Sequence, residues 1–452
     1  MDGLTKTIAA YASSFALRDA PEAIIAGAER SLVDTLACAI GGRDCEVARV
    51  GRRLAEGQAT TRYAGRIVGQ AARTGPELAA FTNTTMLRYL DFNDTWHGGH
   101  PSDLLGGLLA IAESVGADGE QLLAAMIVGY EVALRVIRAT RLRERGWDQG
   151  FAIGLGTTAA VGNLLGLTLD QAAHAVAITA VANVPLRATR AGQLSLWKGA
   201  ATAYACRNGL FAALLAAEGV TGPDRPFEGR HGLWEQITGP FELEPFADRG
   251  GAFLLPTTRL KYWPVEYNAQ AGVWAAIELR ARMRLADIAR IEIATYWSTW
   301  HEIGSEPEKW DPKTRETADH SLPYIFARAL VDGGIMVGSF DEAAYTDATL
   351  RPLMAKISVR EDAEIEKLFP DVVVMRVTAT AHDGRETVVE VTNPKGHDRN
   401  PMTLDDVAIK FRGLVEPALG PIAAASALEQ WATIRRARAL TPAMDLLQVA
   451  NR

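Results

Sequence analysis

Apolar residues recur every three to four positions over roughly the first 250 residues of the chain. This spacing is typical of helices that bury one face. It predicts helices over 21–40, 104–114, 121–137, 172–184 and 200–218. Gly41–Gly42 and Gly219 follow two of them, and glycine readily adopts the left-handed conformation that ends many helices. Alanine and glycine are frequent inside these segments, so we expect helices that approach one another closely in a layered core.

The pattern changes after about Phe253, where strand-like stretches begin. These stretches cover residues 291–297, 372–381 and 387–391. Apolar and polar residues alternate in the first of them, as in a half-buried strand. Asp383–Gly384 separates the other two and is a strong signal for a hairpin turn. A helical pattern covers 324–331, between the strands. We therefore expect residues 257–392 to form a smaller α/β unit.

Helical patterning returns in the last sixty or so residues. Thr403 and Asp406 have the spacing of a capping box, in which each side chain bonds the backbone of the other residue. The pattern therefore predicts a mainly α protein. Its large all-helical domain is made from both chain ends, 1–256 and 393–452, and the smaller α/β domain of 257–392 is inserted as a lid.

One uncharged stretch is long enough for a membrane test. Residues 149–169 carry no charge over 21 positions, and the uncharged run resumes after Asp170. The length alone would suit a transmembrane helix. However, the stretch contains threonine, asparagine, glutamine and several glycines, and Thr168–Gln171 has the spacing of a capping box. We therefore predict buried core helices here, with no membrane partner and no secretory signal at the N-terminus.

The composition excludes several classes of protein. Hydrophobic residues make up 48 % of the 452 residues and charged residues 22 %, which excludes disorder as the main state. Lys and Arg total 47 and Asp and Glu total 54, so the net charge of −7 argues against a general nucleic-acid binder. The three cysteines, Cys38, Cys45 and Cys206, form no CxxC pair and are too few for a disulfide framework or an iron–sulfur cluster. We expect a cytoplasmic protein.

The densest polar cluster is the segment LDFNDTWHGGHPSD, residues 90–103. It lies between two apolar helical segments, where polar groups must be hydrogen-bonded or serve a site. One interpretation is a general acid/base pair with donors for a small polar substrate. The other is a capped helix junction without catalysis. His97 and His100 lack the spacing that places two ligands on one helix face, so we predict no metal.

Isolated cations in apolar surroundings suggest a second feature. Lys198 is the only charged residue between Arg190 and Arg207, and Lys261 lies near the expected domain boundary. Each lysine could be a residue at the edge of the core. Together with Arg187, Arg190 and His100 around one cleft, they would instead form a local cationic pocket for a di- or tricarboxylate.

These segments resemble the MmgE/PrpD family, which includes 2-methylcitrate dehydratase, cis-aconitate decarboxylase and iminodisuccinate epimerase. The resemblance begins at DFNDTWHGGHPSD and continues in order through WKGAATAYACRNGLFAALLAAEGVTGP, LKYWPVEYNAQ, RETADHSLPYIFARALVDG and NPKGHDRNP. It implies a large helical domain made from both chain ends, an inserted α/β lid and a homodimer. It also implies a reaction that needs no metal and no organic cofactor.

The resemblance assigns roles to individual residues. It implies catalytic residues at Asp91, Thr95, His100, Lys198 and Tyr324. The resemblance also includes Lys261, which would bind a substrate carboxylate. For Arg187 we expect the same role on other grounds, because it follows an uncharged helix and could form an anion-binding end.

Two further positions are expected to contact substrate and depart from parts of the family. Decarboxylase-like members have a histidine where this chain has Asp148, whereas the dehydratase branch tends to have aspartate. Many members have a histidine where this chain has Asn268. Asparagine exchanges no proton at neutral pH, so an acid/base role there is in doubt.

The chemistry leads to one expected function and three alternatives. Dehydrating a β-hydroxy acid needs a base, an acid for the departing hydroxyl and cations for the carboxylates. We expect a cofactor-independent hydro-lyase acting on 2-methylcitrate or citrate, with His100 and Asp91 as the acid/base centre. The alternatives are a cis-aconitate decarboxylase, an iminodisuccinate-type epimerase and an inactive carboxylate-binding homologue.

Overall fold

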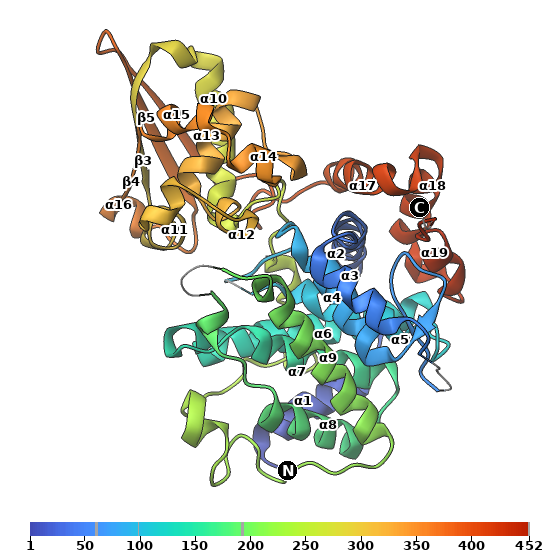
Figure 1. The fold of residues 1–452 in the computed structure, drawn as a ribbon. Helices are drawn as coiled ribbons and strands as arrows, with labels where there is room; N and C mark the ends of the chain where they lie inside the picture. Colours follow the sequence, from blue (N-terminus) through green and yellow to red (C-terminus); the bar gives the residue numbers. More distant parts are fainter. Residues whose placement is uncertain (59–61, 98, 191–193, 451–452) are drawn as a thin grey trace.

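The computed structural model describes residues 1–58, 62–97, 99–190 and 194–450. The described chain is mainly helical and has two large hydrophobic cores. One core is built from residues up to 260 and from 402 onward, which we call the helical part. The other is built from residues 265–391, which we call the sheet part. Figure 1 shows the helical part below and the sheet part above it.

Among the residues that the structure describes, the helical part begins with nine α-helices packed against one another. They are α1 (Gly3–Ser14), α2 (Glu22–Gly41), α3 (Glu46–Ala55), α4 (Pro76–Tyr89), α5 (Leu105–Ile111), α6 (Gly119–Thr140), α7 (Gly150–Leu164), α8 (Leu169–Ala182) and α9 (Trp197–Ala217). A short hairpin, β1 (Gly65–Arg66) and β2 (Arg73–Thr74), precedes α4. Helix α7 contacts both α6 and α9, and nearly all its side chains are buried. Within the described residues, none of the helices is both long and apolar enough to cross a membrane. The prediction of buried core helices is confirmed.

Two helix ends test the sequence prediction. A left-handed glycine follows α9, as predicted, because Gly219 has a φ of 92°. The same prediction for the end of α2 is wrong, because Gly42 has a φ of −90°. Gly42 is there for space: a Cβ atom would lie 2.1 Å from the carbonyl oxygen of Met86. The close approach of α2 and the end of α4 thus requires glycine.

The sheet part contains four strands in the order β4-β3-β5-β6. They are β3 (Ile288–Thr295), β4 (Ile357–Glu361), β5 (Val374–Ala381) and β6 (Glu386–Thr392). β3 pairs with β4 in parallel and with β5 antiparallel, and β5 pairs with β6 antiparallel. The predicted strands and the Asp383–Gly384 turn are confirmed, with Gly384 at a φ of 86°. β4 was not predicted: it is an edge strand with one buried residue, so it lacks a clear alternation.

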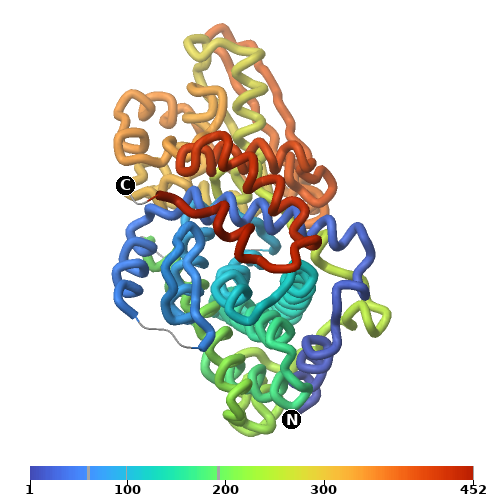
Figure 2. Tube along the Cα trace, turned by 90° about the vertical axis from the view of Figure 1, so that its right-hand side faces the viewer, coloured from blue at the N-terminus to red at the C-terminus, as the bar shows by residue number. Residues whose placement is uncertain are grey.

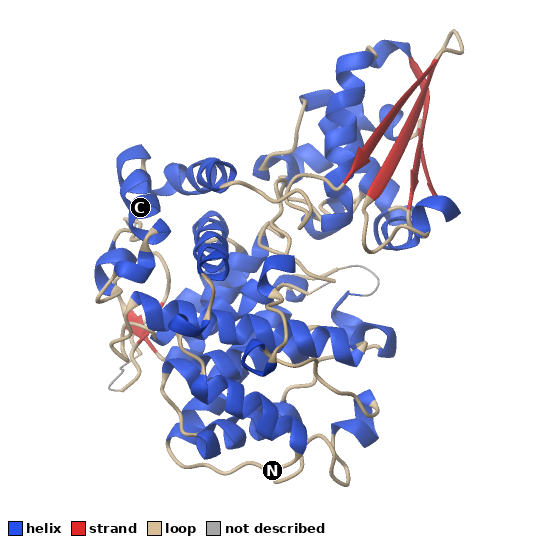
Figure 3. Ribbon diagram, turned by 180° about the vertical axis from the view of Figure 1, so that it is seen from behind, coloured by secondary structure: helices blue, strands red, loops and turns tan. Residues whose placement is uncertain are grey.

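Helices cover one face of this sheet (Figure 3). The two longest are α10 (Gln270–Arg282), which packs on β5 and β6, and α13 (Leu322–Asp332), which packs on α10. Five shorter helices complete this part: α11 (Trp297–Ile303), α12 (Arg315–Ala318), α14 (Glu342–Tyr345), α15 (Arg351–Met354) and α16 (Ala363–Glu366). The predicted helix over 324–331 corresponds to α13.

The chain then returns to the helical part. Helices α17 (Leu404–Leu419), α18 (Pro421–Ala432) and α19 (Thr441–Asp445) follow the sheet, and α17 packs on α2. Figure 2 shows these last helices beside the first ones. The predicted capping box is present, since Thr403 accepts from the backbone N–H of Asp406 at 3.1 Å. Both chain ends therefore share one core; the boundaries at 257 and 392 stay a prediction.

Candidate active site

The segment after helix α4 carries the centre of a charged cluster. Asp91 lies two residues beyond the end of α4 and has a φ of 49°. Residues other than glycine seldom adopt such values. The side chain of Asp91 is only 2 % exposed. Unusual backbone conformations of this kind gather at functional sites, where the surrounding structure holds them in place.

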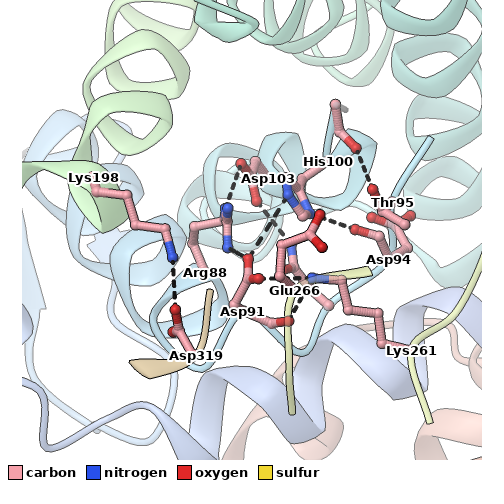
Figure 4. Close-up of polar contacts among 12 residues, drawn as sticks. Arg88, Asp91, Asp94, Thr95, His100, Asp103, Lys198, Lys261, Glu266 and Asp319 are labelled. Atoms are coloured by element: carbon pink, nitrogen blue, oxygen red, sulfur yellow. Dashed lines mark hydrogen bonds and ion pairs between the residues drawn. The ribbon is translucent and has the colours of Figure 1, made fainter. Parts of the chain in front are cut away.

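Two cations hold the Asp91 carboxylate (Figure 4). Arg88, one turn earlier on α4, pairs with Oδ1. Lys261 Nζ lies 2.9 Å from Oδ2 and 2.6 Å from the Asp91 carbonyl oxygen. Burial by itself would raise the pKa of Asp91, but Arg88 and Lys261 outweigh it and hold that pKa well below its usual range. Burial also lowers the pKa of Lys261, and Asp91 opposes this. Two buried cations thus share one carboxylate.

His100 lies against this group in a defined orientation. Its Nδ1 is 2.6 Å from the carbonyl oxygen of Asp94. A carbonyl only accepts, so Nδ1 carries the proton and Nε2 carries the lone pair. Nε2 lies 3.9 Å from Asp91 Oδ1. Burial, followed by Arg88 and Lys261, lowers the pKa of His100 well below its ordinary value. The imidazole is therefore neutral near pH 7 and able to accept a proton at Nε2.

Polar groups behind His100 fix its loop. The Asp94 carboxylate accepts from Ser102 N at 3.1 Å, Ser102 Oγ at 2.5 Å and Tyr130 OH at 2.8 Å. Burial raises the pKa of Asp94 to about 7 despite these bonds. Burial also raises the pKa of Asp103 to about 6, while Arg88 opposes the shift. Hydrogen bonds thus hold the segment after α4 in place, while His100 and Asp91 still lie side by side.

The sheet part contributes a second group. Asp319 and His320 lie between α12 and α13, and the Asp319 carboxylate pairs with His320 Nδ1. Lys198, on α9 of the helical part, places Nζ 3.5 Å from Asp319 Oδ1 and 3.5 Å from His320 Nδ1. Lys198 and Asp319 therefore form an ion pair between the two parts of the molecule (Figure 4).

Glu266 and Asn268 also belong to the sheet part and lie at its start. Burial raises the pKa of Glu266 to about 7, and Lys261 opposes this. Asn268 donates from its backbone N to Glu266 Oε2 at 2.7 Å and from Nδ2 to Oε1 at 3.2 Å. Tyr296 OH donates to Asn268 Oδ1 at 2.7 Å. Asn268 is thus a bonded neighbour of Glu266.

Other predicted site residues lie in separate contacts. Thr95 Oγ1 donates to the carbonyl oxygen of Gly99 at 3.2 Å. Asp148 Oδ2 pairs with Arg190 Nε at 2.6 Å, and its other oxygen accepts from the backbone N of Gly150 at 3.0 Å, at the start of α7. These contacts occupy polar atoms that a substrate would otherwise engage.

Arg187 makes a second ion pair between the two parts. Its Nη2 lies 3.3 Å from Oε1 of Glu302 on α11, and Arg143 Nη2 lies 3.3 Å from the same oxygen.

Tyr324 is not brought to the charged cluster. Its ring is buried in the core of the sheet part, 6.1 Å from the ring of Phe340. Its hydroxyl donates to the carbonyl oxygen of Ser339. A role for Tyr324 in catalysis stays a prediction, and it would need the hydroxyl to change partners.

Two family models match the chain. The MmgE/PrpD N-terminal domain matches residues 6–245 and the MmgE/PrpD C-terminal domain matches residues 263–432. The chain belongs to the MmgE/PrpD family. The resemblance drawn from the sequence segments is confirmed, and this family is one of enzymes.

Relatives of this MmgE/PrpD member carry two kinds of name. The 2-methylcitrate dehydratase of Cupriavidus necator is 30 % identical over 367 residues, which is 74 % of each chain. The 2-methylcitrate dehydratase of Escherichia coli (strain K12) is 29 % identical over 367 residues, again 74 % of each chain. The cis-aconitate decarboxylase of Aspergillus terreus is 27 % identical over 458 residues, covering 91 % of this chain and 89 % of its own.

Three of the charged groups in this MmgE/PrpD site were not singled out from the sequence. Arg88 precedes Asp91 by three residues, a spacing that brings two side chains together on a helix, and this was the available signal. Asp319 and His320 are neighbours in an ordinary polar segment. They acquire a possible role only because the fold places them against Lys198.

A narrow pocket touches this cluster. Arg88 and Lys198 line it together with Cys45, Thr85, Tyr89 and Glu316 among others. Its volume of about 20 Å³ leaves room for about one water. A molecule larger than water enters this pocket only if the surrounding groups move.

A metal site needs several ligand side chains close together among the residues that the structure describes. No cluster of three or more His, Cys, Asp or Glu side chains there is arranged to hold a metal ion.

Proposed function

We propose that this MmgE/PrpD chain is a hydro-lyase that dehydrates 2-methylcitrate or citrate to the unsaturated tricarboxylic acid. The observation that carries the proposal is the neutral His100 held beside two buried cations. His100 Nε2, which carries the lone pair, lies 3.9 Å from Asp91 Oδ1. Arg88 and Lys261 both pair with this Asp91 carboxylate. A neutral base next to two buried cations suits proton removal beside a carboxylate. The names of the relatives support the same reaction class.

The proposed reaction begins with substrate exchange at the ion pairs. One substrate carboxylate takes a place beside Lys261 and Arg88, and another replaces Asp319 at Lys198. These cations stabilise the negative charge that develops as the C–H bond breaks. His100 Nε2 accepts the proton, and the Asp94 carbonyl keeps the ring in the tautomer that allows this. The electron pair of the C–H bond forms the C=C bond. The C–O bond breaks with its electron pair staying on oxygen, and the departing hydroxyl takes up a proton from a general acid and leaves as water.

The remaining residues have supporting roles in the proposal. Thr95 donates to the substrate from the loop that holds His100. Arg187 and Asp148 each have a counter-ion, at 3.3 Å and 2.6 Å, and they adjust the charge around the substrate. Asn268 holds Glu266. Tyr324 would join only if its hydroxyl leaves Ser339.

The sheet part acts as a lid in this proposal. The pocket beside Lys198 accepts about one water, so substrate enters only when the two parts separate. The pairs Lys198–Asp319 and Arg187–Glu302 join the parts, and a carboxylate substrate competes with both carboxylates. Separation of the two parts breaks these pairs, substrate carboxylates then take the places of Asp319 and Glu302, and reclosure excludes water.

The proposal extends to assembly and location. A surface hollow of about 460 Å³ is lined by Phe81, Trp197 and Tyr204 among others. Trp197 and Tyr204 are each 46 % exposed, so this apolar surface supports a homodimer. Light scattering that gives the monomer mass would contradict this.

The proposed location is the cytoplasm. All three cysteines are free and buried, which suits a reducing compartment.

Proton NMR tests the reaction. Purified, chelator-treated protein is mixed with 2-methylcitrate, citrate and cis-aconitate in separate tubes. We expect the unsaturated acid to form from a hydroxy acid without added metal. Release of CO₂ from cis-aconitate would move the assignment to a decarboxylase, which the 91 % coverage by the Aspergillus terreus relative favours as second candidate. No reaction in any tube would contradict both assignments, and amino-diacids would be tried next.

A substitution tests the base. His100→Gln should lower kcat by about 10²–10⁴-fold, the usual contribution of a general base. The matched control is His231→Gln, because His231 has a side chain that is 68 % exposed. A His100→Gln protein that folds and keeps its kcat would contradict the role of His100.

A further inference from the structure

The Asp319–His320 pair is a second acid/base group that the reaction above does not use. Asp319 is 2 % exposed and His320 is 19 % exposed, so the imidazole is the accessible member. The carboxylate of Asp319 pairs with His320 Nδ1. An ionised carboxylate only accepts, so Nδ1 carries the proton. The nitrogen that exchanges a proton with a ligand is therefore Nε2.

The position of the pair is set from both parts of the molecule. The backbone N of Glu266 donates to the Asp319 carbonyl oxygen at 3.0 Å, which fixes the loop from the sheet side. Lys198 reaches across from the helical part to within 3.5 Å of Asp319 Oδ1 and of His320 Nδ1. The charges of Lys198 and His320 both act on Asp91, the centre of the site. His100 and His320 thus belong to one cluster but come from different parts of the chain.

The two histidines differ in the partner of Nδ1. The ring of His100 donates to a backbone carbonyl, which is neutral. The ring of His320 donates to a carboxylate, whose charge stabilises the imidazolium form. The same residue type is thus suited to opposite tasks: His100 to accept a proton and His320 to donate one.

We propose that His320, oriented by Asp319, is the general acid that protonates the departing hydroxyl. This assignment rests on the proposed dehydration. As the C–O bond breaks, its electron pair stays on oxygen, and the Nε2 proton of the imidazolium bonds to that oxygen. Water leaves, His320 becomes neutral, and the proton that His100 removed is returned to solvent. Solvent then supplies a proton to His320 before the next turnover.

Substrate binding places the required charge on His320. The charged groups facing the ring are Lys198 from α9, Asp319 on its own loop and Asp91 beyond. Burial, and then the Lys198 cation, lower the pKa of His320 in the ligand-free protein. A substrate carboxylate at Lys198 offsets that cation, which favours the imidazolium when substrate is present. The acid is therefore ready only in the complex.

The test separates the acid from the base by changing the leaving group. Fluoride leaves without needing a strong acid, so a substrate analogue with fluorine in place of the hydroxyl bypasses the acid. His320→Gln should lower kcat for the hydroxy acid by about 10²–10⁴-fold, the usual contribution of a general acid, with KM changed less than about threefold. On the fluoro analogue it should keep kcat within about fivefold of the wild type. His100→Gln should lose activity on both.

Controls make each outcome decisive. His382→Gln serves as the matched substitution, because His382 is exposed in the same part of the molecule. Asp319→Asn should give an intermediate loss on the hydroxy acid, since the amide oxygen still orients the ring without stabilising its charge. Equal losses for His320→Gln on both substrates would overturn the assignment and leave the dehydratase standing. Wild-type protein with no dehydratase activity would overturn the proposed function and this assignment with it.

Discussion

Two buried lysine–aspartate pairs lie close together in this protein, and they differ in what surrounds them. Lys261 Nζ lies 2.9 Å from Asp91 Oδ2, and Lys410 Nζ, on α17, lies 2.7 Å from Asp34 Oδ1 on α2. All four side chains are at most 4 % exposed. By distance and burial alone the two pairs would be considered equivalent.

Their neighbours separate a site from a framework. Asp91 has a second cation, Arg88, which also lies 3.8 Å from Asp103 Oδ2, and a neutral imidazole at 3.9 Å. Lys410 instead donates to two carbonyl oxygens, of Phe92 at 2.6 Å and of Lys261 at 3.0 Å. Its ammonium has three acceptors and no capacity left for a ligand. Two cations and an imidazole gathered around one carboxylate indicate a binding site, whereas an ammonium with three acceptors indicates a structural clamp.

The framework pair should show the largest effect on stability. Lys410→Met leaves Asp34 buried without its counter-ion and leaves two carbonyls without a donor. We expect the free energy of unfolding to fall by about 3–5 kcal/mol, measured by urea denaturation. The combined change Asp34→Leu with Lys410→Met removes the stranded charge and should recover part of this loss. A loss below about 1 kcal/mol for Lys410→Met would contradict the clamp.

The site pair should show a smaller effect on stability and a larger one on binding. In Lys261→Met, Arg88 remains paired with Asp91, so the carboxylate keeps a counter-ion. We expect the free energy of unfolding to fall by about 1–3 kcal/mol. KM should rise at least about tenfold, because a substrate carboxylate loses one cation. Equal losses of stability for Lys261→Met and Lys410→Met would erase the distinction between the pairs.

The pH dependence of stability sharpens the site side of the comparison. Burial raises the pKa of Asp94 from 3.8 to about 7, so between these values the folded state keeps a proton that the unfolded state has lost. Stability from this group therefore falls as pH rises from about 4 to about 7 and is constant above. Asp94→Asn does not titrate, so wild type minus variant should decline over that window. A flat difference in unfolding free energy would contradict the raised pKa.

The smallest expected effect lies at the start of the helix that carries Lys410. Thr403 caps α17 by accepting from the backbone N–H of Asp406. Thr403→Ala should cost about 1 kcal/mol of unfolding free energy, the usual value of an N-cap. Lys410 lies two turns further on, so kcat and KM should not change. A loss of activity in this variant would mean that the clamp depends on the end of the helix.

Sequence reasoning reached the features that depend on neighbouring residues. Helix periodicity, the capping boxes at Thr168 and Thr403, and the hairpin at Asp383–Gly384 are all present. Each depends on contacts within about four positions, which the chain order itself brings together. The polar segment around His100 and the resemblance to the family were likewise recognised from residues that are neighbours in the sequence.

Tertiary structure alone decided which charges meet. Lys261 and Asp91 are 170 positions apart, and Lys410 and Phe92 are 318 apart. Arg88, Asp319 and His320 gained their interest only from such contacts, while Tyr324 was placed in another core. An ion pair depends on distance and burial, which a local pattern does not encode. The sequence therefore determined the helices, the strands of clear alternation and the residue types of the site, and the fold determined the partners of each charge.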